Sequence, residues 1–277
     1  NITAFCRWYR RYYGIDSDSR IAAYASFGFD ASMMDIYGAI TNGAQLHIIP
    51  EEIRLDFMGL QSYFDENGIT HSFMTTQVGR QFALEMKCKS LKYLSIGGEK
   101  LVPCEPPKGY TFINAYGPTE TTIFITLFEV DKYYPNVPIG KALDNAKLYI
   151  ADKFGHMLPP GACGELMITG WQVSRGYLNK PEKTAEVYTK NIYDDTPGYE
   201  VMYHSGDVAR YLPDGNIQII GRKDSQVKIR GFRIELSEVE EVIRRYPGIK
   251  DATVVAFDEQ GGGKYIAAYV VSDSEVD

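Results

Sequence analysis

Short apolar runs alternate with longer amphipathic segments through the first part of the chain, up to about residue 115. The apolar runs predict strands at 21–26, 44–49, 69–73, 91–96 and 110–113, and the segments around them predict helices at 2–13, 33–40, 55–66 and 77–86. Strands that alternate with helices in this way indicate crossover connections and a largely parallel sheet. Ligands of such sheets bind at the carboxyl ends of the strands. The loops that follow the first, fourth and fifth strands are therefore expected to share one edge of the sheet and one site.

The pattern changes after about Asp131, where proline and glycine separate short strands with little helix between them. These strands are predicted at 147–151, 165–169, 198–204, 208–212 and 217–220, with a hairpin turn at Asp214-Gly215. They predict a small antiparallel, barrel-like subdomain.

A third pattern begins near Asp224. It predicts a strand at 226–230, a helix at 237–245 and strands at 252–257 and 265–271. Ser237 precedes Glu240 by three residues, which fits a capping box at the start of that helix. The fold class is thus α/β plus β, with an α/β subdomain at 1–130, a barrel-like subdomain at 131–223 and an α+β unit at 224–277, joined by a linker at 222–225.

Composition narrows the functional classes. Hydrophobic residues make up 44% and charged residues 23% of the 277 residues, which is ordinary for a globular protein. The net charge of −7 argues against nucleic acid or an anionic membrane as the main partner. The cysteines lack C-x-x-C spacing, no apolar run has the length of a membrane span, and the first residues do not resemble a signal peptide. A cytoplasmic protein with reduced thiols is expected.

The stretch from Asn114 to Thr122 carries the strongest local chemistry. A Gly117-Pro118 turn follows one apolar run and precedes another, so its backbone N–H groups should point outward beside threonine hydroxyls and one carboxylate, Glu120. Free N–H groups and hydroxyls suit phosphate oxygens, and a single carboxylate suits Mg²⁺. Alternatively, Thr119 or Thr121 caps a short helix with Glu120 in its first turn, and these residues alone slightly favour the cap.

Two further stretches have possible roles. Asp207 follows a glycine and could accept hydrogen bonds from a ribose diol, although by itself it is more simply an ordinary turn aspartate. The segment 221–235 collects cations that could face phosphate, but a charged run is more often a solvated strand.

These stretches occur together and in order, and with them the chain resembles the adenylate-forming (AMP-binding) enzyme superfamily. Within it, the chain is similar to the adenylation domains of non-ribosomal peptide synthetases. The segments that carry the resemblance are Phe29–Ser32, Asn114–Glu120, Gly164–Leu166 with Gly170, Ser174–Tyr177, Tyr203–Asp207 and Gly221–Glu235. The resemblance covers nearly the whole chain and implies an acetyl-CoA synthetase-like fold whose last unit is a mobile lid.

The resemblance implies activation of an amino acid with Mg-ATP as an aminoacyl-adenylate, followed by transfer to the phosphopantetheine of a peptidyl carrier protein domain beside other synthetase domains. A D-alanine–carrier ligase, another acyl- or aryl-CoA ligase, and a non-catalytic docking module remain alternatives. The family's phosphate loop would precede residue 1 and its C-terminal catalytic lysine would lie beyond Asp277. We therefore expect an internal piece of a longer adenylation domain that is weak or inactive alone.

The family pattern also implies site roles. Thr119 would donate to the α-phosphate, Glu120 would ligate Mg²⁺, Lys228 would approach the pantetheine channel, and Asp224 would be the hinge of the lid. Tyr116 would stack on adenine, Asp207 would accept from the ribose hydroxyls and Arg222 would assist there. The remaining nucleotide contacts would be Asn114, Ala115, Gly117 and Ile219, the last an aliphatic residue where the family often has an aromatic one.

By the same resemblance, Asp30 would pair with the substrate α-ammonium, although it could also cap the helix that follows. The implied pocket walls are Phe29, Ala31, Met34, Phe73, Ser95, Gly97, Ala115, Ile123 and Phe124. Phe73 and Ser95 lie outside the tight motifs. These walls contain no charged side chain, and an unpaired charge in an apolar pocket is costly. An apolar, branched aliphatic substrate such as Leu, Ile or Val is therefore expected rather than Trp.

Overall fold

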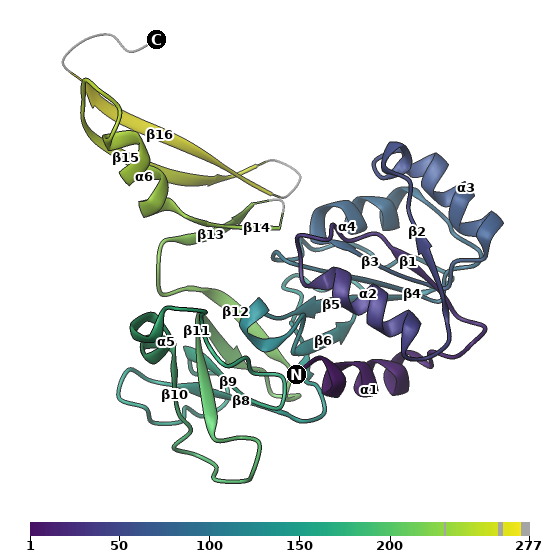
Figure 1. Ribbon diagram of the computed structural model, residues 1–277, viewed down its shortest axis with the longest axis horizontal. Helices are drawn as coiled ribbons and strands as arrows, with labels where there is room; N and C mark the ends of the chain where they lie inside the picture. The colour runs from purple at the N-terminus through teal and green to yellow at the C-terminus, as the bar shows by residue number, and fades with distance from the viewer. Residues whose placement is uncertain (230, 260–262, 273–277) are drawn as a thin grey trace.

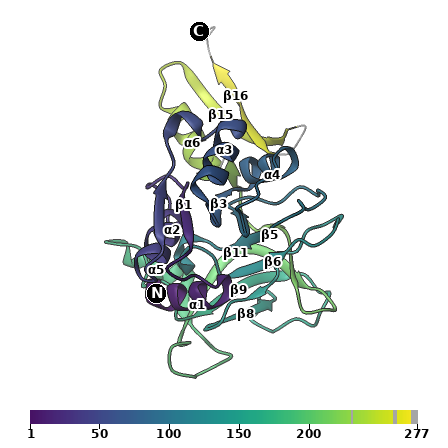
Figure 2. The same cartoon turned by 90° about the vertical axis from the view of Figure 1, so that its right-hand side faces the viewer.

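The computed structural model describes residues 1–229, 231–259 and 263–272 (Figure 1). The chain builds an α/β part, then an antiparallel sheet beside it, and then a C-terminal unit. Figures 1 and 2 both place strands β15 (Ile249–Asp258) and β16 (Lys264–Ser272) of this unit at the opposite end of the molecule from β8 (Ala146–Ala151).

The α/β part is organised around a sheet of order β2-β1-β3-β4-β5-β6-β7. Strands β1 to β5 run parallel, while β6 and β7 are antiparallel to their neighbours. In chain order from β1 to β7, the strand bounds are Arg20–Ala23, Gln45–Ile48, His71–Thr75, Tyr93–Gly97, Thr111–Tyr116, Thr126–Glu129 and Lys141–Ala142. The predicted, largely parallel sheet is therefore present. Its last strand, the antiparallel β7, lies beyond residue 130, where the α/β subdomain was predicted to end.

Helices cover both faces of this sheet because alternate strand residues point to opposite sides. Helices α3 (Phe57–Asn67) and α4 (Thr76–Glu85) pack with Met74, Leu94 and Phe112 on one side. Helices α1 (Ile2–Tyr13) and α2 (Ala31–Ile40) cover the other side. The predicted helix 2–13 has its predicted bounds and ends at Gly14, whose φ of 64° lies in the left-handed region that glycine tolerates. Helix α2 begins two residues earlier than predicted.

The second sheet is antiparallel and has the order β10-β11-β9-β8, with β12 also paired to β11. Its further strands are β9 (Gly164–Gly170), β10 (Tyr188–Lys190), β11 (Val201–Tyr211) and β12 (Ile217–Arg222), with helix α5 at Pro181–Val187. The prediction of two strands at 198–204 and 208–212 was wrong, because β11 is continuous. A register shift between His204 and Val208 absorbs the extra residues, and Gly206 supplies the positive φ of 73° there.

The C-terminal unit contains the hairpin of β13 (Gln226–Ile229) and β14 (Phe232–Glu235), helix α6 (Leu236–Arg244) and the β15–β16 pair. Arg230, the last residue of the predicted strand 226–230, lies outside the described residues. The predicted capping box at Ser237 and Glu240 was wrong. Glu235 takes the N-cap position, so Ser237 already lies inside the helix, and the Glu240 carboxylate accepts from the Val254 backbone at 2.9 Å.

His71 is buried where β3 begins, between α1 and the sheet. Its Nε2 lies 3.2 Å from the Tyr13 carbonyl and its Nδ1 lies 2.7 Å from the Thr70 hydroxyl. Because a carbonyl only accepts, Nε2 carries the proton in the neutral ring. Burial lowers the pKa of His71 to about 4.

This depressed pKa predicts a pH dependence of stability. The unfolded state binds a proton near pH 6.5 and the folded state only near pH 4, so the stabilisation is complete above pH 6.5 and is lost as the pH falls towards 4. Between pH 7 and 4.5 the unfolding free energy of the native chain should fall by about 2 kcal/mol more than that of His71→Gln. Urea titrations at both values measure this difference, and equal pH dependence of the two proteins would contradict it.

Among the residues that the structure describes, none of the helices combines the length and the apolar composition that crossing a membrane requires.

Candidate active site

The loop between β5 and β6 is held in an unusual backbone conformation. A Cβ at Gly117 would lie 2.3 Å from the Phe124 Cα, so only glycine fits there. The short 3₁₀ turn Thr119–Thr121 ends in Thr122 and Ile123, whose φ values of 63° and 72° are both positive. Positive φ at a β-branched residue is strained, and such strain persists mainly where surrounding structure imposes it.

The prediction that Thr119 or Thr121 caps a short helix was wrong, although Glu120 does lie in the first turn of a short 3₁₀ helix. Pro118 takes the position before the turn, and the Thr121 hydroxyl donates to the Pro118 carbonyl at 2.9 Å. The Thr119 side chain is exposed, and it contacts the Asp30 carboxyl as described below.

Asp207 on β11 connects the loop to the second sheet. The Tyr116 hydroxyl donates to its Oδ2, and Arg222 donates from Nη1 to its Oδ1 at 2.8 Å. Arg222 also binds Asp224 through two parallel bonds of 2.7 Å. Burial lowers the pKa of Arg222, but the Asp224 and Asp207 carboxylates raise it more. The net pKa increases, so the guanidinium remains charged. Each Asp207 oxygen can accept a further hydrogen bond, because a carboxylate offers about four lone-pair sites.

Glu120 forms a second polar centre a few residues along the same loop. Its Oε1 accepts from the Tyr177 hydroxyl at 2.6 Å and from Arg233 Nη1 at 2.8 Å. Burial raises the pKa of Glu120, but Tyr177 and Arg233 lower it more, so the carboxyl is ionised at neutral pH.

The Glu120 carboxylate fits a magnesium ligand. Within the described residues, its Oε2 is buried and has no hydrogen-bond partner, so this oxygen has unused acceptor capacity. The described residues contain no group of three or more His, Cys, Asp or Glu placed to hold a metal ion. A metal bound at Glu120 would therefore take its other ligands from phosphate and water, as Mg²⁺ commonly does.

Asp30 lies at the start of α2 and faces the loop. It occupies the N-cap position, but its Oδ2 accepts from the Ile123 backbone N–H at 3.3 Å, across the cleft from its own helix. Burial raises the pKa of Asp30, and the Thr119 hydroxyl and the Ile123 N–H offset part of that increase. The carboxylate therefore joins α2 to the β5–β6 loop.

The predicted substrate residues gather on one face of the α/β sheet. Phe73, Ser95 and Ile113 are register partners on neighbouring strands, and Gly97 pairs with Ala115 further along the same face. A single apolar cluster contains Ala31, Met34, Phe73, Ala115, Ile123 and Phe124.

Some of these side chains already have partners. The Ser95 hydroxyl lies 2.7 Å from the Tyr13 hydroxyl, and the Phe124 ring packs edge-on against Phe5 and Trp8 of α1. A Cβ at Gly97 would meet the Ala115 carbonyl oxygen at 2.7 Å, so the backbones approach closely there.

The remaining predicted residues lie around the same cleft. Asn114 is buried and donates to the Pro138 carbonyl at 2.8 Å, while Ile219 packs with Tyr116 against the core of the second sheet. Phe29 contacts Phe232 of the β13–β14 hairpin with ring centroids 5.1 Å apart. Lys228, on β13, is half-buried; burial lowers its pKa, against the raising effect of the nearby Asp207 charge.

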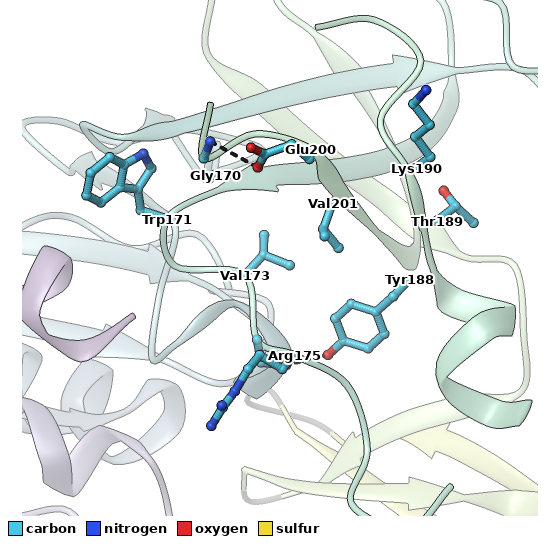
Figure 3. Close-up of a pocket in the computed structure, with 11 residues that line it drawn as sticks. Gly170, Trp171, Val173, Arg175, Tyr188, Thr189, Lys190, Glu200 and Val201 are labelled. Carbon is cyan, nitrogen blue, oxygen red and sulfur yellow. Dashed lines mark hydrogen bonds between the residues drawn. The ribbon is translucent and has the colours of Figure 1, made fainter. Parts of the chain in front are cut away.

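A hollow of about 790 Å³ lies elsewhere, on the second sheet (Figure 3). Trp171, Arg175, Lys190 and Glu200 are among the residues that line it. Its described lining includes none of the predicted site residues, and it opens beside Ser174, whose backbone N–H donates to the Glu120 carbonyl. At Glu120 itself, the Arg233 side chain of the β13–β14 hairpin contacts the carboxylate.

Sequence reasoning assigned no role to three residues that complete the cleft. Tyr177 and Arg233 bind Glu120, and Glu99 accepts from the Gly231 backbone at 2.7 Å. Alternation along β14 places Arg233 on the same face as its register partner Lys228, which is the one sequence-level signal that could have identified it.

Comparison with known proteins decides the family. A model described as AMP-binding enzyme matches residues 1–178. The chain belongs to the AMP-binding enzyme family. Over 98% of its length it is 43% identical to bacitracin synthase 1 of Bacillus licheniformis, and over 97% it is 41% identical to surfactin synthase subunit 1 of Bacillus subtilis. It spans only 5% and 7% of those relatives.

Solved structures confirm the predicted fold class. Holo-PA1221, an NRPS protein containing adenylation and PCP domains, matches 94% of this AMP-binding chain with a TM-score of 0.84 and 27% identity. The adenylation domain AlmE of Vibrio cholerae, in complex with glycyl-adenosine-5'-phosphate, matches 98% with a TM-score of 0.83 and 25% identity. The chain covers 46% and 54% of these two structures. The fold is that of adenylation domains.

Proposed function

We propose that this chain activates an amino acid with Mg-ATP as an aminoacyl-adenylate, within an amino-acid-adenylating ligase of the non-ribosomal peptide synthetase type. The observation that carries the proposal is the contact between Tyr116 and Asp207. It joins the sheet-edge loop to the second sheet, and the Asp207 and Glu120 charges both act on Lys228, so an aromatic ring and two carboxylates lie near one another. The synthetase relatives and the glycyl-adenylate complex of AlmE support the same chemistry.

The roles in this proposal follow from the contacts. Tyr116 and Ile219 provide apolar surface for adenine, and Asp207 offers acceptors to the ribose hydroxyls while Arg222 holds its carboxylate in place. Asp30 pairs with the substrate ammonium group, and its link to Ile123 fixes it against the loop. When bound at Glu120, Mg²⁺ would neutralise phosphate charge.

The chemistry asked of these residues is positioning. The amino-acid carboxylate oxygen forms a bond to the α-phosphorus of ATP, and the bond from that phosphorus to the bridging oxygen breaks as pyrophosphate leaves. Thr119, at the exposed tip of the loop, donates to an α-phosphate oxygen as its charge develops.

The apolar cluster behind Asp30 supports a branched aliphatic side chain for the substrate. Met34, Phe73 and Ile123 are buried there, and a charged substrate would find no partner among them. The adenylate would then pass to the phosphopantetheine thiol of a carrier protein, with Lys228 and Gly231 of the β13–β14 hairpin beside the channel. The adenylation–PCP pairing of PA1221 supports that partner.

Amino-acid-dependent pyrophosphate exchange tests the proposal. The full chain, with whatever residues its gene encodes on either side, should exchange fastest with Leu, Ile or Val, and at least about tenfold more slowly with Asp, Glu or Lys. Preference for a charged amino acid, for D-alanine or for an aryl acid would overturn the substrate assignment. The absence of ATP binding in a direct titration would favour a non-catalytic docking module.

A further inference from the structure

The β13–β14 hairpin presents two cations side by side. Lys228 and Arg233 are register partners on the antiparallel strands, so their side chains leave the same face directly opposite each other. Like charges in that arrangement repel and destabilise an isolated hairpin. The hairpin is therefore expected to need negative charge opposite this face.

The cleft supplies that charge. Arg233 donates to the Glu120 carboxylate at 2.8 Å, and the Asp207 and Glu120 charges both act on Lys228. Two further contacts hold the same hairpin against the α/β part: the Gly231 N–H bonds the Glu99 carboxylate, and Phe232 packs on Phe29. The hairpin is thus docked against the α/β part, with Arg233 bound to the Glu120 carboxylate.

In this docked position the Glu120 carboxylate is closed to a metal ion. Its Oε1 already accepts from both Tyr177 and Arg233, and its Oε2 is buried, with less than 1 Å² of solvent-accessible surface. Mg²⁺ requires near-octahedral oxygen ligands at about 2.0–2.1 Å and usually keeps several water molecules. Tyr177 lies three residues after Ser174, whose backbone N–H binds the Glu120 carbonyl, whereas Arg233 belongs to the hairpin, so Arg233 is the contact that displacement of the hairpin would remove.

We propose that Arg233 replaces the divalent cation on Glu120, so that docking of the hairpin and metal loading of the cleft exclude each other. This rests on the proposed function, in which Glu120 is the metal ligand. Arg233 is a positioning residue. A divalent cation and the Arg233 guanidinium would occupy the Glu120 carboxylate in turn, so the position of the hairpin would report whether a metal ion is bound there.

Amide hydrogen exchange of peptides that cover β13 and β14 tests the exclusion. Exchange in the full chain is measured under two conditions, saturating AMP with EDTA and saturating AMP with saturating Mg²⁺. KCl matches the ionic strength of the two, so that differences in screening do not contribute. AMP is used because it lacks the β- and γ-phosphates that could displace the hairpin by themselves. Mg²⁺ should speed exchange in the hairpin about tenfold in the native chain.

Variants distinguish displacement of Arg233 from Glu120 by Mg²⁺ from a nonspecific effect of Mg²⁺ on the stability of the hairpin. Arg233→Gln should exchange quickly with and without Mg²⁺, Glu120→Gln should show no response to Mg²⁺, and Arg233→Lys should recover part of the response because it keeps the charge. Arg245→Gln is the matched control, since Arg245 pairs with Glu241 on the exposed side of α6, and it should respond like the native chain.

Two outcomes overturn the inference by different routes. If AMP protects the amides around Tyr116 and Asp207 but Mg²⁺ leaves hairpin exchange unchanged, or if Arg233→Gln responds to Mg²⁺ like the native chain, the exclusion is wrong while nucleotide binding stands. If AMP gives no protection around Tyr116 and Asp207, the proposed function fails and this inference fails with it.

Discussion

Replacement of Asp207 by alanine should weaken ATP binding by at least about a hundredfold. The change removes the carboxylate that would accept from the ribose hydroxyls, and it also leaves Tyr116 and Arg222 without this hydrogen-bond acceptor. The Tyr116 hydroxyl would lose the group that orients its ring, and Arg222 would keep only Asp224 as a carboxylate partner. Isothermal titration of the full chain with ATP, with and without Mg²⁺, measures the loss.

The matched control for this variant is Asp214→Ala. Asp214 lies in the exposed turn that joins β11 to β12, and its carboxylate accepts from the backbone and side chain of Asn216 in that turn, so ATP affinity should be unchanged. The ATP affinity of Asp207→Asn should lie between those of Asp207→Ala and Asp214→Ala, because the amide oxygen can still accept a hydrogen bond while the negative charge is lost. If Asp207→Ala bound ATP with native affinity, the proposed nucleotide site beside Asp207 would be wrong.

Gly140→Ala should destabilise the fold by about 4 kcal/mol, the largest effect expected from any single added methyl group here. Gly140 has a φ of 88°, and a Cβ there would lie 1.6 Å from the Leu127 carbonyl oxygen on β6. Its own carbonyl accepts from the Ile217 N–H at 2.8 Å, where the second sheet meets the first. The methyl group would therefore push the segment at Gly140 away from β6 and disturb its bridge to Ile217 of the second sheet.

Gly161→Ala separates the clash from the dihedral strain. Gly161 has a nearly identical φ of 89°, but a Cβ at that position would meet nothing within 4 Å. The loss there should be only about 1 kcal/mol, the cost of a left-handed non-glycine residue. Guanidinium titrations of both variants give the comparison, and equal losses would show that backbone strain, rather than contact with β6, sets the cost at Gly140.

The sequence predicts most of the α/β part well because its information is local. The helix from Ile2 to Tyr13 has an apolar face and stops at Gly14, and both features act within a few residues. The sites at Asn114–Glu120 and Tyr203–Asp207 could also be identified from short motifs. The structure joins them through Tyr116, the last residue of β5, and Asp207, which lies within β11 of the second sheet.

Errors occurred where long-range contacts compete with local preference. The pattern at Ser237 and Glu240 fits a capping box, yet Glu240 is used by the Val254 backbone on a neighbouring strand. Gly206 marks a turn by composition, but pairing with β9 on one side and β12 on the other keeps β11 continuous through it. In both places the tertiary partner contributes more than the local signal.

By itself the sequence determined the alternation of strands and helices in the α/β part, the position of the polar loop after β5 and the family to which the chain belongs. These follow from hydrophobic periodicity and short motifs, which act over a few neighbouring residues. Only the tertiary structure decided which charges meet, since Glu120 and Arg233 lie 113 positions apart and pair across two parts of the fold. The identity of that partner depends on where the hairpin docks, which no local pattern encodes.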